Sequence, residues 1–273
     1  MNATRIALVT GATDGIGTAT AEELARRGLE VVLHGRSDSR LDSARRAIEA
    51  AVPGARLHTV KGDLASLASV REMGAELVAR FPKLHVLLWN AGVFANDRTL
   101  TPDGLELTFQ VNHLSHFLLT SLLDAPLRAA ASEDARVVTV SSIAHTRARL
   151  DWDDVHLATR FDGYGAYATS KLANVMFANE LARRLTGTGI VSHSLHPGVI
   201  TTKLLREGFG TTGSSVAEGA RTSVHVATSD DARRVTGRYF VRSAPAAPNP
   251  LASDERACQR LWQLSEELVR ARR

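Results

Sequence analysis

Short apolar runs alternate with longer helical patterns along the whole chain, and this alternation limits the fold more than any other feature. The runs are almost continuous in apolar side chains, as expected of strands that are covered on both faces. The predicted strands are Ile6–Thr10, Val31–His34, Leu57–Val60, Val86–Trp89, Arg136–Val140, Ile190–Leu195 and Arg238–Val241. The predicted helices are Ile16–Arg27, Arg40–Ala51, Leu67–Arg80, Gly104–Ala125, Ala166–Thr186, Val216–Thr228 and Glu255–Arg270, with Asp63 as a cap before Leu67.

Strands that alternate with helices need crossover connections, so the sheet should be mostly parallel with helices on both faces. We therefore expect an α/β fold, a Rossmann-type doubly wound sheet of about seven strands. No linker, short-period repeat or low-complexity block interrupts the 273 residues, which indicates a single domain over residues 1–273. The Pro- and Ala-rich stretch Ser243–Pro250 is expected to be a loop before the final helix.

Composition excludes several classes of function. The net charge is only +4 and the arginines are scattered, so a nucleic-acid partner is not expected. One cysteine, Cys258, forms no internal disulfide and suits a reducing cytoplasm. Met1–Thr10 lacks the layout of a signal peptide, and no apolar stretch approaches the ~18 residues that span a bilayer. The sequence thus predicts a cytoplasmic protein without a membrane partner.

A glycine-rich turn follows the first predicted strand directly. Gly11, Gly15 and Gly17 have the spacing G-x-x-x-G-x-G, and a helix begins near Ile16. Glycine permits positive φ and a close backbone approach, while the helix start directs free N–H groups into the turn. The alternative is a tight strand–helix turn that needs glycine for geometry alone. Its place in an N-terminal strand–helix–strand unit favours the pyrophosphate of a dinucleotide.

The end of the second strand indicates which dinucleotide. A carboxylate there suits the ribose 2′-hydroxyl of NAD, and an arginine suits a 2′-phosphate. Here the strand is followed by Gly35, Arg36 and Ser37. Arg36 is a planar donor that always carries charge, so we favour a role in binding the 2′-phosphate of NADP(H). The alternative is an arginine that is merely exposed to solvent in a loop. Asp38 lies close in sequence and keeps NAD(H) open.

Tyr167 and Lys171 lie four residues apart on a predicted helix, on the same face. Tyr164 has Ala168 at the corresponding position and lacks such a partner. An ammonium beside a phenol favours the phenolate, so Lys171 should lower the pKa of Tyr167 from about 10. That would make the phenol an acid or base. The alternative is a Tyr–Lys pair that only covers a helix surface.

Seven motifs, all in one order along Thr10–Thr202, resemble the short-chain dehydrogenase/reductase family. They are TGATDGIG (Thr10–Gly17), GDL (Gly62–Leu64), WNAG (Trp89–Gly92), VN (Val111–Asn112), VVTVSS (Val137–Ser142), YATSK (Tyr167–Lys171) and HPGVITT (His196–Thr202). Two positions depart from the family pattern: Trp89, where asparagine is usual, and Asp14, where many NADP-using members carry a basic residue. We interpret Trp89 as a packing change that leaves Asn90 in place.

The resemblance implies roles for four catalytic residues. Tyr167 resembles the acid/base, and Lys171 resembles the residue that tunes it and holds the nicotinamide ribose. Ser142 resembles the donor that steadies the substrate carbonyl, and Asn112 resembles the asparagine that supports a water linked to Lys171. The resemblance also implies cofactor contacts at Gly11, Thr13, Asp14, Gly15, Ile16, Gly17, Arg36, Ser37, Asp63, Leu64, Asn90, Ala91, Gly92, Tyr167, Lys171, Pro197, Gly198, Val199 and Thr202.

The interval between Ser142 and Tyr167 is longer than in the simplest family members. This insert of about residues 145–165, with HGR after the second strand and LWQLSEELV in the last helix, resembles the retinol dehydrogenase and protochlorophyllide reductase branch. That branch handles bulky apolar carbonyls or polyenes. Residues 203–220 are expected to form a substrate lid, in which Leu204, Leu205 and Phe209 contact the substrate.

We therefore expect an NADP(H)-dependent oxidoreductase, a carbonyl reductase that interconverts a ketone or aldehyde with an alcohol on a bulky apolar small molecule. Two alternatives stay open: a C=C reductase of the same fold, and a dinucleotide-binding sensor without chemistry. No metal site is expected, because His113 and His116 have no third ligand at useful spacing and are interpreted as core or surface residues. The resemblance leaves a homo-oligomer open.

Overall fold

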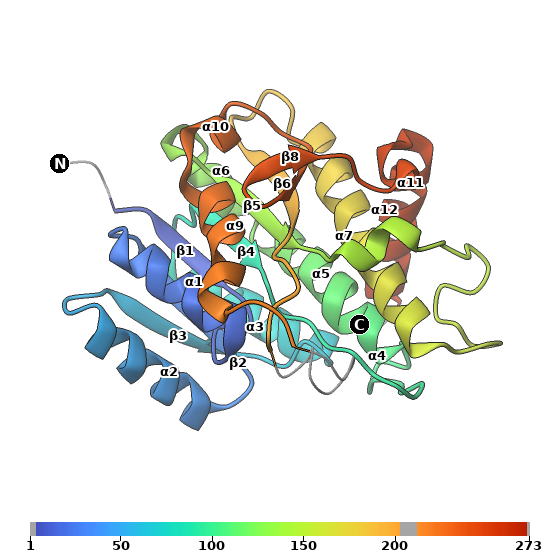
Figure 1. The fold of residues 1–273 in the computed structure, drawn as a ribbon, viewed down its shortest axis with the longest axis horizontal. Helices are drawn as coiled ribbons and strands as arrows, with labels where there is room; N and C mark the ends of the chain where they lie inside the picture. The colour runs from blue at the N-terminus through green and yellow to red at the C-terminus, as the bar shows by residue number, and fades with distance from the viewer. Residues whose placement is uncertain (1–3, 203–211, 272–273) are drawn as a thin grey trace.

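An eight-stranded sheet runs through the centre of the molecule (Figure 1). The computed structural model describes residues 4–202 and 212–271. The strand order is β3-β2-β1-β4-β5-β6-β7-β8. The strands are β1 (Ile6–Val9), β2 (Glu30–Gly35), β3 (Leu57–Lys61), β4 (Val86–Trp89), β5 (Arg136–Val140), β6 (Val191–His196), β7 (Arg238–Val241) and β8 (Ala244–Ala246).

The first seven strands are parallel, as the alternation of strands and helices predicts. Strand β1 lies between β2 and β4, with Val9 opposite Leu33 on one side and Leu88 on the other. The chain therefore winds outward from β1 in one direction and then in the other. The point where the direction reverses leaves a crevice at the carboxyl ends of the strands, where ligands bind in such sheets.

The eighth strand corrects the prediction of a loop at Ser243–Pro250. Residues Ala244–Ala246 pair antiparallel with β7, with Pro245 opposite Phe240. Pro245 is tolerated because β8 is the edge strand, where one side of the backbone needs no ladder partner. The Rossmann-type sheet is confirmed, with one short strand more than expected.

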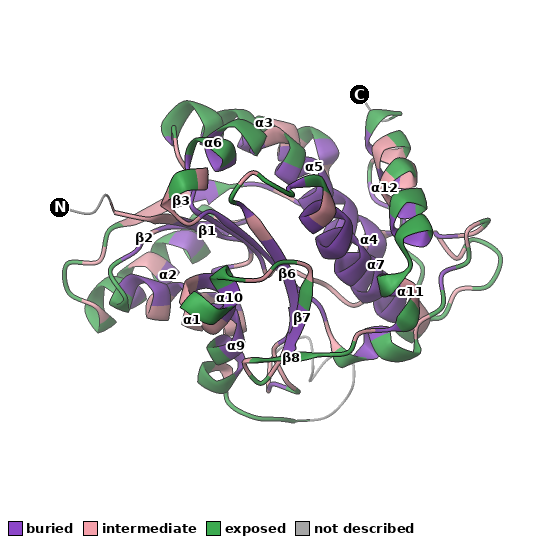
Figure 2. Cartoon of the chain, turned by 90° about the horizontal axis from the view of Figure 1, so that it is seen from above, coloured by how far each residue is buried: buried purple, intermediate pink, exposed green. Residues whose placement is uncertain are grey.

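Helices cover both faces of the sheet (Figure 2). One core packs α3, α5, α7 and α12 against the sheet, and the other packs α1, α2 and α9 against its opposite face. The helices are α1 (Gly15–Arg26), α2 (Asp38–Ala51), α3 (Leu67–Arg80), α4 (Leu107–Phe109), α5 (Ser115–Leu122), α6 (Asp124–Ala129), α7 (Gly163–Arg184), α9 (Val216–Thr228), α10 (Asp230–Arg233), α11 (Pro250–Ser253) and α12 (Glu255–Arg270). None of these helices is long and apolar enough to cross a bilayer.

The predicted continuous helix Gly104–Ala125 is wrong in its detail. The structure divides this stretch into α4, a π-helical turn η1 (Gln110–Leu114), α5 and the start of α6. The carboxylate of Glu106 caps α4 by accepting hydrogen bonds from the backbone N–H groups of Thr108 and Phe109. A π-helical turn widens the helix locally and is often found at functional sites. Here it carries Asn112.

The predicted cap before Leu67 is also wrong. Ser66, not Asp63, caps helix α3 by accepting a hydrogen bond from Ser69 N at 3.3 Å. The Asp63 carboxylate instead accepts from Ala65 N at 3.0 Å, within the loop that leads to the helix. This arrangement leaves Asp63 at the carboxyl end of β3, on the side of the crevice.

Helix α12 packs on the outer side of α5 and α7, the two helices that border the crevice. Trp262 lies edge-on to Phe117 of α5, with 4.8 Å between ring centroids, and stacks on Phe177 of α7 at 5.9 Å. The Arg184 guanidinium lies 4.2 Å from the centre of the Trp262 ring. Together with the sheet and the neighbouring turns, α12 buries every residue of α7 from Ala166 to Ala182 within the single chain.

Candidate active site

One cleft of about 1210 Å³ lies along the carboxyl ends of the strands, at the point where the winding reverses. Every predicted catalytic and cofactor residue except Asn112 lines it. The turn after β1 and the ends of β2, β3 and β4 form one end, which we call the cofactor end. The ends of β5 and β6 with helix α7 form the other, which we call the substrate end.

The glycine-rich turn makes a close-fitting cradle at the cofactor end. Gly11 and Gly15 have φ values of +66° and +55°, which favour glycine. A Cβ atom on Gly17 would lie 2.1 Å from the Gly11 carbonyl oxygen, so no side chain fits there. Within the described residues Asp14 makes no side-chain capping bond at α1, so the helix N-terminus faces the cleft uncapped. This geometry fits a pyrophosphate.

Two arginines line the edge of the cofactor end. Arg36 is exposed in the cleft, as the sequence predicts for the 2′-phosphate position. Arg40 was not predicted, although it lies one turn into the helix that Ser37 caps. It forms an ion pair with Asp14 at 3.1 Å. The pair offsets the negative charge of Asp14, at a position where many NADP-using members of the resembled family carry a basic residue.

Asp38, the residue that kept NAD(H) open, does not line the cleft. It forms an ion pair with Lys61 at 2.6 Å. The edge of the cofactor end therefore presents two guanidinium groups, and the two carboxylates beside them, Asp14 and Asp38, are each held in an ion pair.

The end of β4 packs against the glycine-rich turn. Asn90 donates from its amide to the Thr10 carbonyl at 2.9 Å, which ties β4 to the glycine-rich turn. Trp89 is buried, donates from its indole nitrogen to Thr120 Oγ1 at 3.0 Å, and stacks on His116 with centroids 5.4 Å apart. Trp89 therefore acts in packing and leaves Asn90 in place, as expected.

His113 and His116, interpreted from the sequence as core or surface residues, both lie in the core. His116 makes a 3.0 Å hydrogen bond with Thr10 Oγ1, and His113 makes one of 2.8 Å with Ser265 of α12. Burial lowers the pKa of each to about 3, so both are neutral. Across residues 4–202 and 212–271, no group of three metal-ligating side chains is present.

Ser142, Tyr167 and Lys171 meet at the substrate end. Ser142 follows β5, and its side chain is hydrogen-bonded to that of Tyr167 on α7. The Lys171 ammonium donates to the Val140 carbonyl at 3.2 Å and lies 5.6 Å from the centre of the Tyr167 ring. Tyr164 lies on the rim and is 46% exposed, whereas Tyr167 is 8% exposed. The buried phenol is therefore the one that faces both partners.

The predicted pKa of Tyr167 is wrong for this structure. Burial raises the pKa of Tyr167 to about 12, because a phenolate loses more hydration than a phenol, and the hydrogen bond from Ser142 only partly offsets this. Burial also lowers the pKa of Lys171 to about 8. The Lys171 ammonium lies 5.6 Å from the centre of the Tyr167 ring. Burial therefore outweighs charge attraction at this pair.

Asn112 lies behind the cleft and is fully buried. Its side-chain oxygen accepts from Val93 N at 2.7 Å, and its amide donates to the Val93 carbonyl at 3.0 Å and to Ser170 Oγ at 2.9 Å. Asn112 thus ties the loop after β4 to helix α7. Its support of a water linked to Lys171 stays a prediction.

A buried network holds the backbone of Ser142 from a distant part of the chain. His145 Nδ1 donates to the Ser142 carbonyl at 2.6 Å, and Asn249 N–H donates to His145 Nε2 at 3.2 Å. Because a carbonyl only accepts and a backbone N–H only donates, these two bonds fix the histidine proton on Nδ1. The Asn249 amide also donates to the carbonyls of His145, Thr146 and Ala148 at 3.0, 3.2 and 3.1 Å. Sequence reasoning missed this network, because its members lie 104 residues apart.

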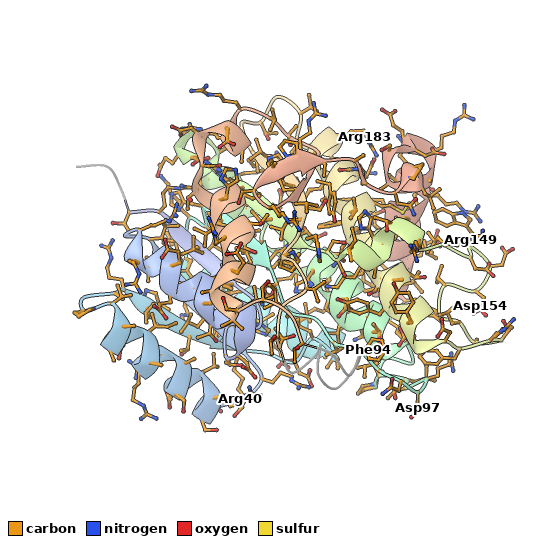
Figure 3. All side chains as sticks on the ribbon, viewed as in Figure 1. Arg40, Phe94, Asp97, Arg149, Asp154 and Arg183 are labelled. Atoms are coloured by element: carbon orange, nitrogen blue, oxygen red, sulfur yellow. The ribbon has the colours of Figure 1, made fainter. Side chains whose placement is uncertain are left out.

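Large apolar side chains are exposed on the rim of the substrate end. Ile143, Tyr164 and Val199 line the cleft and are 48%, 46% and 51% exposed. Phe94 lies edge-on to Tyr167, with ring centroids 5.8 Å apart, and lies between Arg40 and Arg149 in Figure 3. The predicted lid contacts Leu204, Leu205 and Phe209 lie outside the described residues, and residues 216–220 belong to helix α9.

Comparison with known proteins places this geometry in a family. The sequence model of the short chain dehydrogenases matches residues 5–211. Human retinol dehydrogenase 13 is 39% identical over 96% of this chain and 83% of its own length. A solved structure from Mycobacterium paratuberculosis has a TM-score of 0.81 and 33% identity over 98% of this chain and 94% of its own.

A short chain dehydrogenase of Shigella flexneri 2a, solved as a complex with NADP, has a TM-score of 0.73 and 26% identity over 88% of this chain and 97% of its own. The family match spans both the glycine-rich cradle and the Ser142–Tyr167–Lys171 cluster. The chain therefore belongs to the short chain dehydrogenase family, in its retinol dehydrogenase-like branch.

Proposed function

We propose that the protein is an NADP(H)-dependent oxidoreductase that interconverts a carbonyl and an alcohol on a bulky apolar small molecule. The observation that carries this proposal is the convergence of Ser142, Tyr167 and Lys171 on one wall of the cleft. The cradle at the other end of the same cleft has the shape and dipole for a dinucleotide.

The three residues divide the chemistry at the carbonyl. A bound nicotinamide cofactor would supply or accept the hydride. Ser142 donates a hydrogen bond to the carbonyl oxygen as negative charge develops, which is worth about 10²–10³ in rate. Tyr167 delivers the proton to that oxygen, worth about 10²–10⁴. Its raised pKa keeps the proton in place at neutral pH, which suits the direction of reduction.

Lys171 holds a positive charge beside the phenol only while it is protonated. Its ammonium lies 3.3 Å from where a Cβ atom on Gly92 would lie, so a side chain at that position would crowd it. The pKa of about 8 leaves Lys171 mainly charged at neutral pH. The charge can then stabilise a phenolate when the reaction runs toward oxidation.

The preference for NADP(H) is supported by Arg36 and Arg40 at the edge of the cofactor end. The planar guanidinium group suits a phosphate because it donates two parallel hydrogen bonds. The NADP complex of the Shigella flexneri relative points the same way. NAD(H) would fit the same cradle without the contacts to the 2′-phosphate, so NAD(H) stays open.

An apolar substrate is supported by the rim of Ile143, Tyr164 and Val199, because exposed large apolar side chains gathered at a cleft mark a binding surface. The similarity to a protein named retinol dehydrogenase agrees with a bulky apolar alcohol. The cytoplasmic location, which the single cysteine suits, stays a prediction, as does self-association.

The test is NADPH oxidation against a panel of aldehydes, ketones and enones of increasing apolar size. Carbonyl reduction that is lost in Tyr167→Phe, with NADPH binding retained, supports the proposal. Turnover of enones at the C=C bond alone would favour the alternative reductase. Binding of NADPH without turnover of any panel member would favour a sensor.

A further inference from the structure

A second hollow of about 320 Å³ lies beside the cleft. Its walls come from the insert before helix α7 and from the first turns of that helix. Tyr164 lines both the cleft and this hollow. The two spaces therefore adjoin at Tyr164, on the exposed side of Tyr167.

The hollow is lined by Arg147, Arg149 and Arg160, and we call it the arginine hollow. All three side chains are exposed, and Figure 3 shows Arg149 on the side of the molecule that carries the insert. Within residues 4–202 and 212–271, none of the three forms an ion pair. Most other arginines of the described chain pair with an acid, as Arg40 does with Asp14.

The acid in the lining does not neutralise these arginines. Asp162 caps helix α7, and its carboxylate accepts from Tyr164 N at 3.3 Å and from Gly165 N at 2.9 Å. That carboxylate also faces the partial positive charge of the helix N-terminus. The lining holds three guanidinium groups and one carboxylate, so the arginine hollow keeps an excess of positive charge.

The walls of the arginine hollow are held in place by specific contacts. The Asp154 carboxylate accepts from Ala158 N at 2.7 Å and from Thr159 N at 2.9 Å, and these bonds lower the pKa of Asp154 to about 2. The Thr169 hydroxyl on α7 donates to the Arg149 carbonyl at 3.2 Å, which ties the insert to the helix. A preformed site loses less entropy when it binds a ligand.

We propose that the arginine hollow binds the anionic end group, a carboxylate or a phosphate, of an amphipathic substrate. The apolar part of that substrate would lie along Ile143, Tyr164 and Val199, with its carbonyl at Tyr167. The volume is at the lower limit of ligand pockets, about 300 Å³, so it accommodates a head group and not the apolar body. This inference rests on the proposed function, because it narrows the class of apolar carbonyl compounds that the same cleft takes.

The experiment compares 12-oxododecanoate with its methyl ester, which share the aldehyde and the chain and differ in one charge. Shorter pairs of eight and ten carbons allow for the span between Tyr167 and the arginines. Wild-type enzyme with NADPH should show kcat/KM about tenfold higher for the acid than for the ester at one of these lengths. The doubly substituted Arg149→Gln, Arg160→Gln enzyme should lose this preference and keep its kcat/KM for the ester.

Arg256→Gln is the matched control, because Arg256 is an exposed arginine on α12 that likewise has no ion pair in the described part of the chain. It should keep the preference for the acid. Equal kcat/KM for acid and ester in wild-type enzyme at all three lengths would overturn the inference. So would a preference that survives the double substitution.

A binding measurement separates this inference from the proposed function. Calorimetric titration of Tyr167→Phe enzyme with each probe, with NADPH present, measures affinity without turnover. Tighter binding of the acid that depends on Arg149 and Arg160 supports the arginine hollow even if wild-type enzyme reduces neither probe. Sedimentation with phosphatidylglycerol vesicles tests whether the arginines bind lipid head groups instead. If the double variant loses vesicle binding and the wild-type enzyme shows no preference for the acid, the assignment of the hollow to a substrate is overturned.

Discussion

The two ends of the cleft are built by different means. At the cofactor end, the binding surface is formed mainly by the backbone. It consists of glycines at positive φ, an uncapped helix start and strand ends whose register is set by the sheet. At the substrate end, side chains form the surface: Ile143 in the 3₁₀ turn after β5, Tyr164 in the first turn of α7 and Val199 after β6 are all exposed. The backbone of Ser142 is held there through His145 and Asn249, which lie 104 residues apart in the chain. The comparison shows that one end is specified by local backbone geometry and the other by long-range contacts.

Tyr167 lies at the substrate end, and its substitution should produce the largest effect. Tyr167→Phe removes the proton donor, so kcat should fall by about 10²–10⁴ while the Kd for NADPH stays within about twofold. Steady-state kinetics and fluorescence titration of NADPH measure the two quantities. Tyr164→Phe is the control and should change kcat little. A parallel loss of NADPH affinity in Tyr167→Phe would show that the ends are not separable.

The next largest effect is expected at the cofactor end alone. Arg36→Ala and Arg40→Ala each remove a charge-assisted contact worth about 1.5–3 kcal/mol, so the Kd for NADPH should rise at least about tenfold in each. The Kd for NADH, which lacks the 2′-phosphate, should change little. Calorimetry with both nucleotides checks this. Unchanged discrimination in both variants would remove the case for NADP(H).

The pH dependence of NADPH binding should report on Lys171. Its pKa of about 8 means that the amine loses its proton above that pH, whereas an anionic ligand favours the ammonium and raises the pKa in the complex. Binding should therefore take up a proton above pH 8, and affinity should fall by up to about tenfold per pH unit there. Calorimetry in two buffers of different ionisation enthalpy measures the uptake.

Lys171→Arg keeps the charge at all these pH values and should flatten the profile. A wild-type Kd that stays constant from neutral pH to well above pH 8 would contradict the lowered pKa.

The smallest effect should come from Asn249, whose hydrogen bonds hold the segment that follows Ser142 at the substrate end. Asn249→Ala removes the side-chain donor to the carbonyls of His145, Thr146 and Ala148, and within the described residues only the His145 carbonyl keeps another donor, Ala148 N. This should cost about 1–3 kcal/mol of unfolding free energy. Loosening of the Ser142 backbone should lower kcat roughly fivefold, equivalent to about 1 kcal/mol, with KM less affected. Thermal unfolding and steady-state kinetics measure both.

Asn179→Ala is the matched control for Asn249→Ala. Asn179 also donates from a buried amide to the C-terminal segment, at the Ala252 carbonyl 2.7 Å away, but does not contact residues 142–148. It should destabilise the protein similarly and leave kcat unchanged. Equal losses of kcat in the two variants would show that Asn249 acts through stability and not through the position of Ser142.

These differences explain what the sequence could predict. The strands and the glycine-rich turn depend on short-range patterns, so their places were predicted to within a few residues. The break at Gln110–Leu114 could not be predicted, because the residues Gly104–Ala125 have ordinary helical character and the break depends on how Asn112 contacts Val93 and Ser170. The pKa of Tyr167 was predicted in the wrong direction, because spacing shows that Lys171 is near but not how deeply the pair is buried.

Helix α12 has a consequence for assembly. It lies over α5 and α7 through Trp262 and Arg184, so the surface of the helices next to the catalytic groups is already occupied by the chain's own carboxyl-terminal segment. A second copy of the protein could pack on this part of α5 and α7 only after displacing α12. Within the described residues, a single chain brings Ser142, Tyr167 and Lys171 together in one cleft.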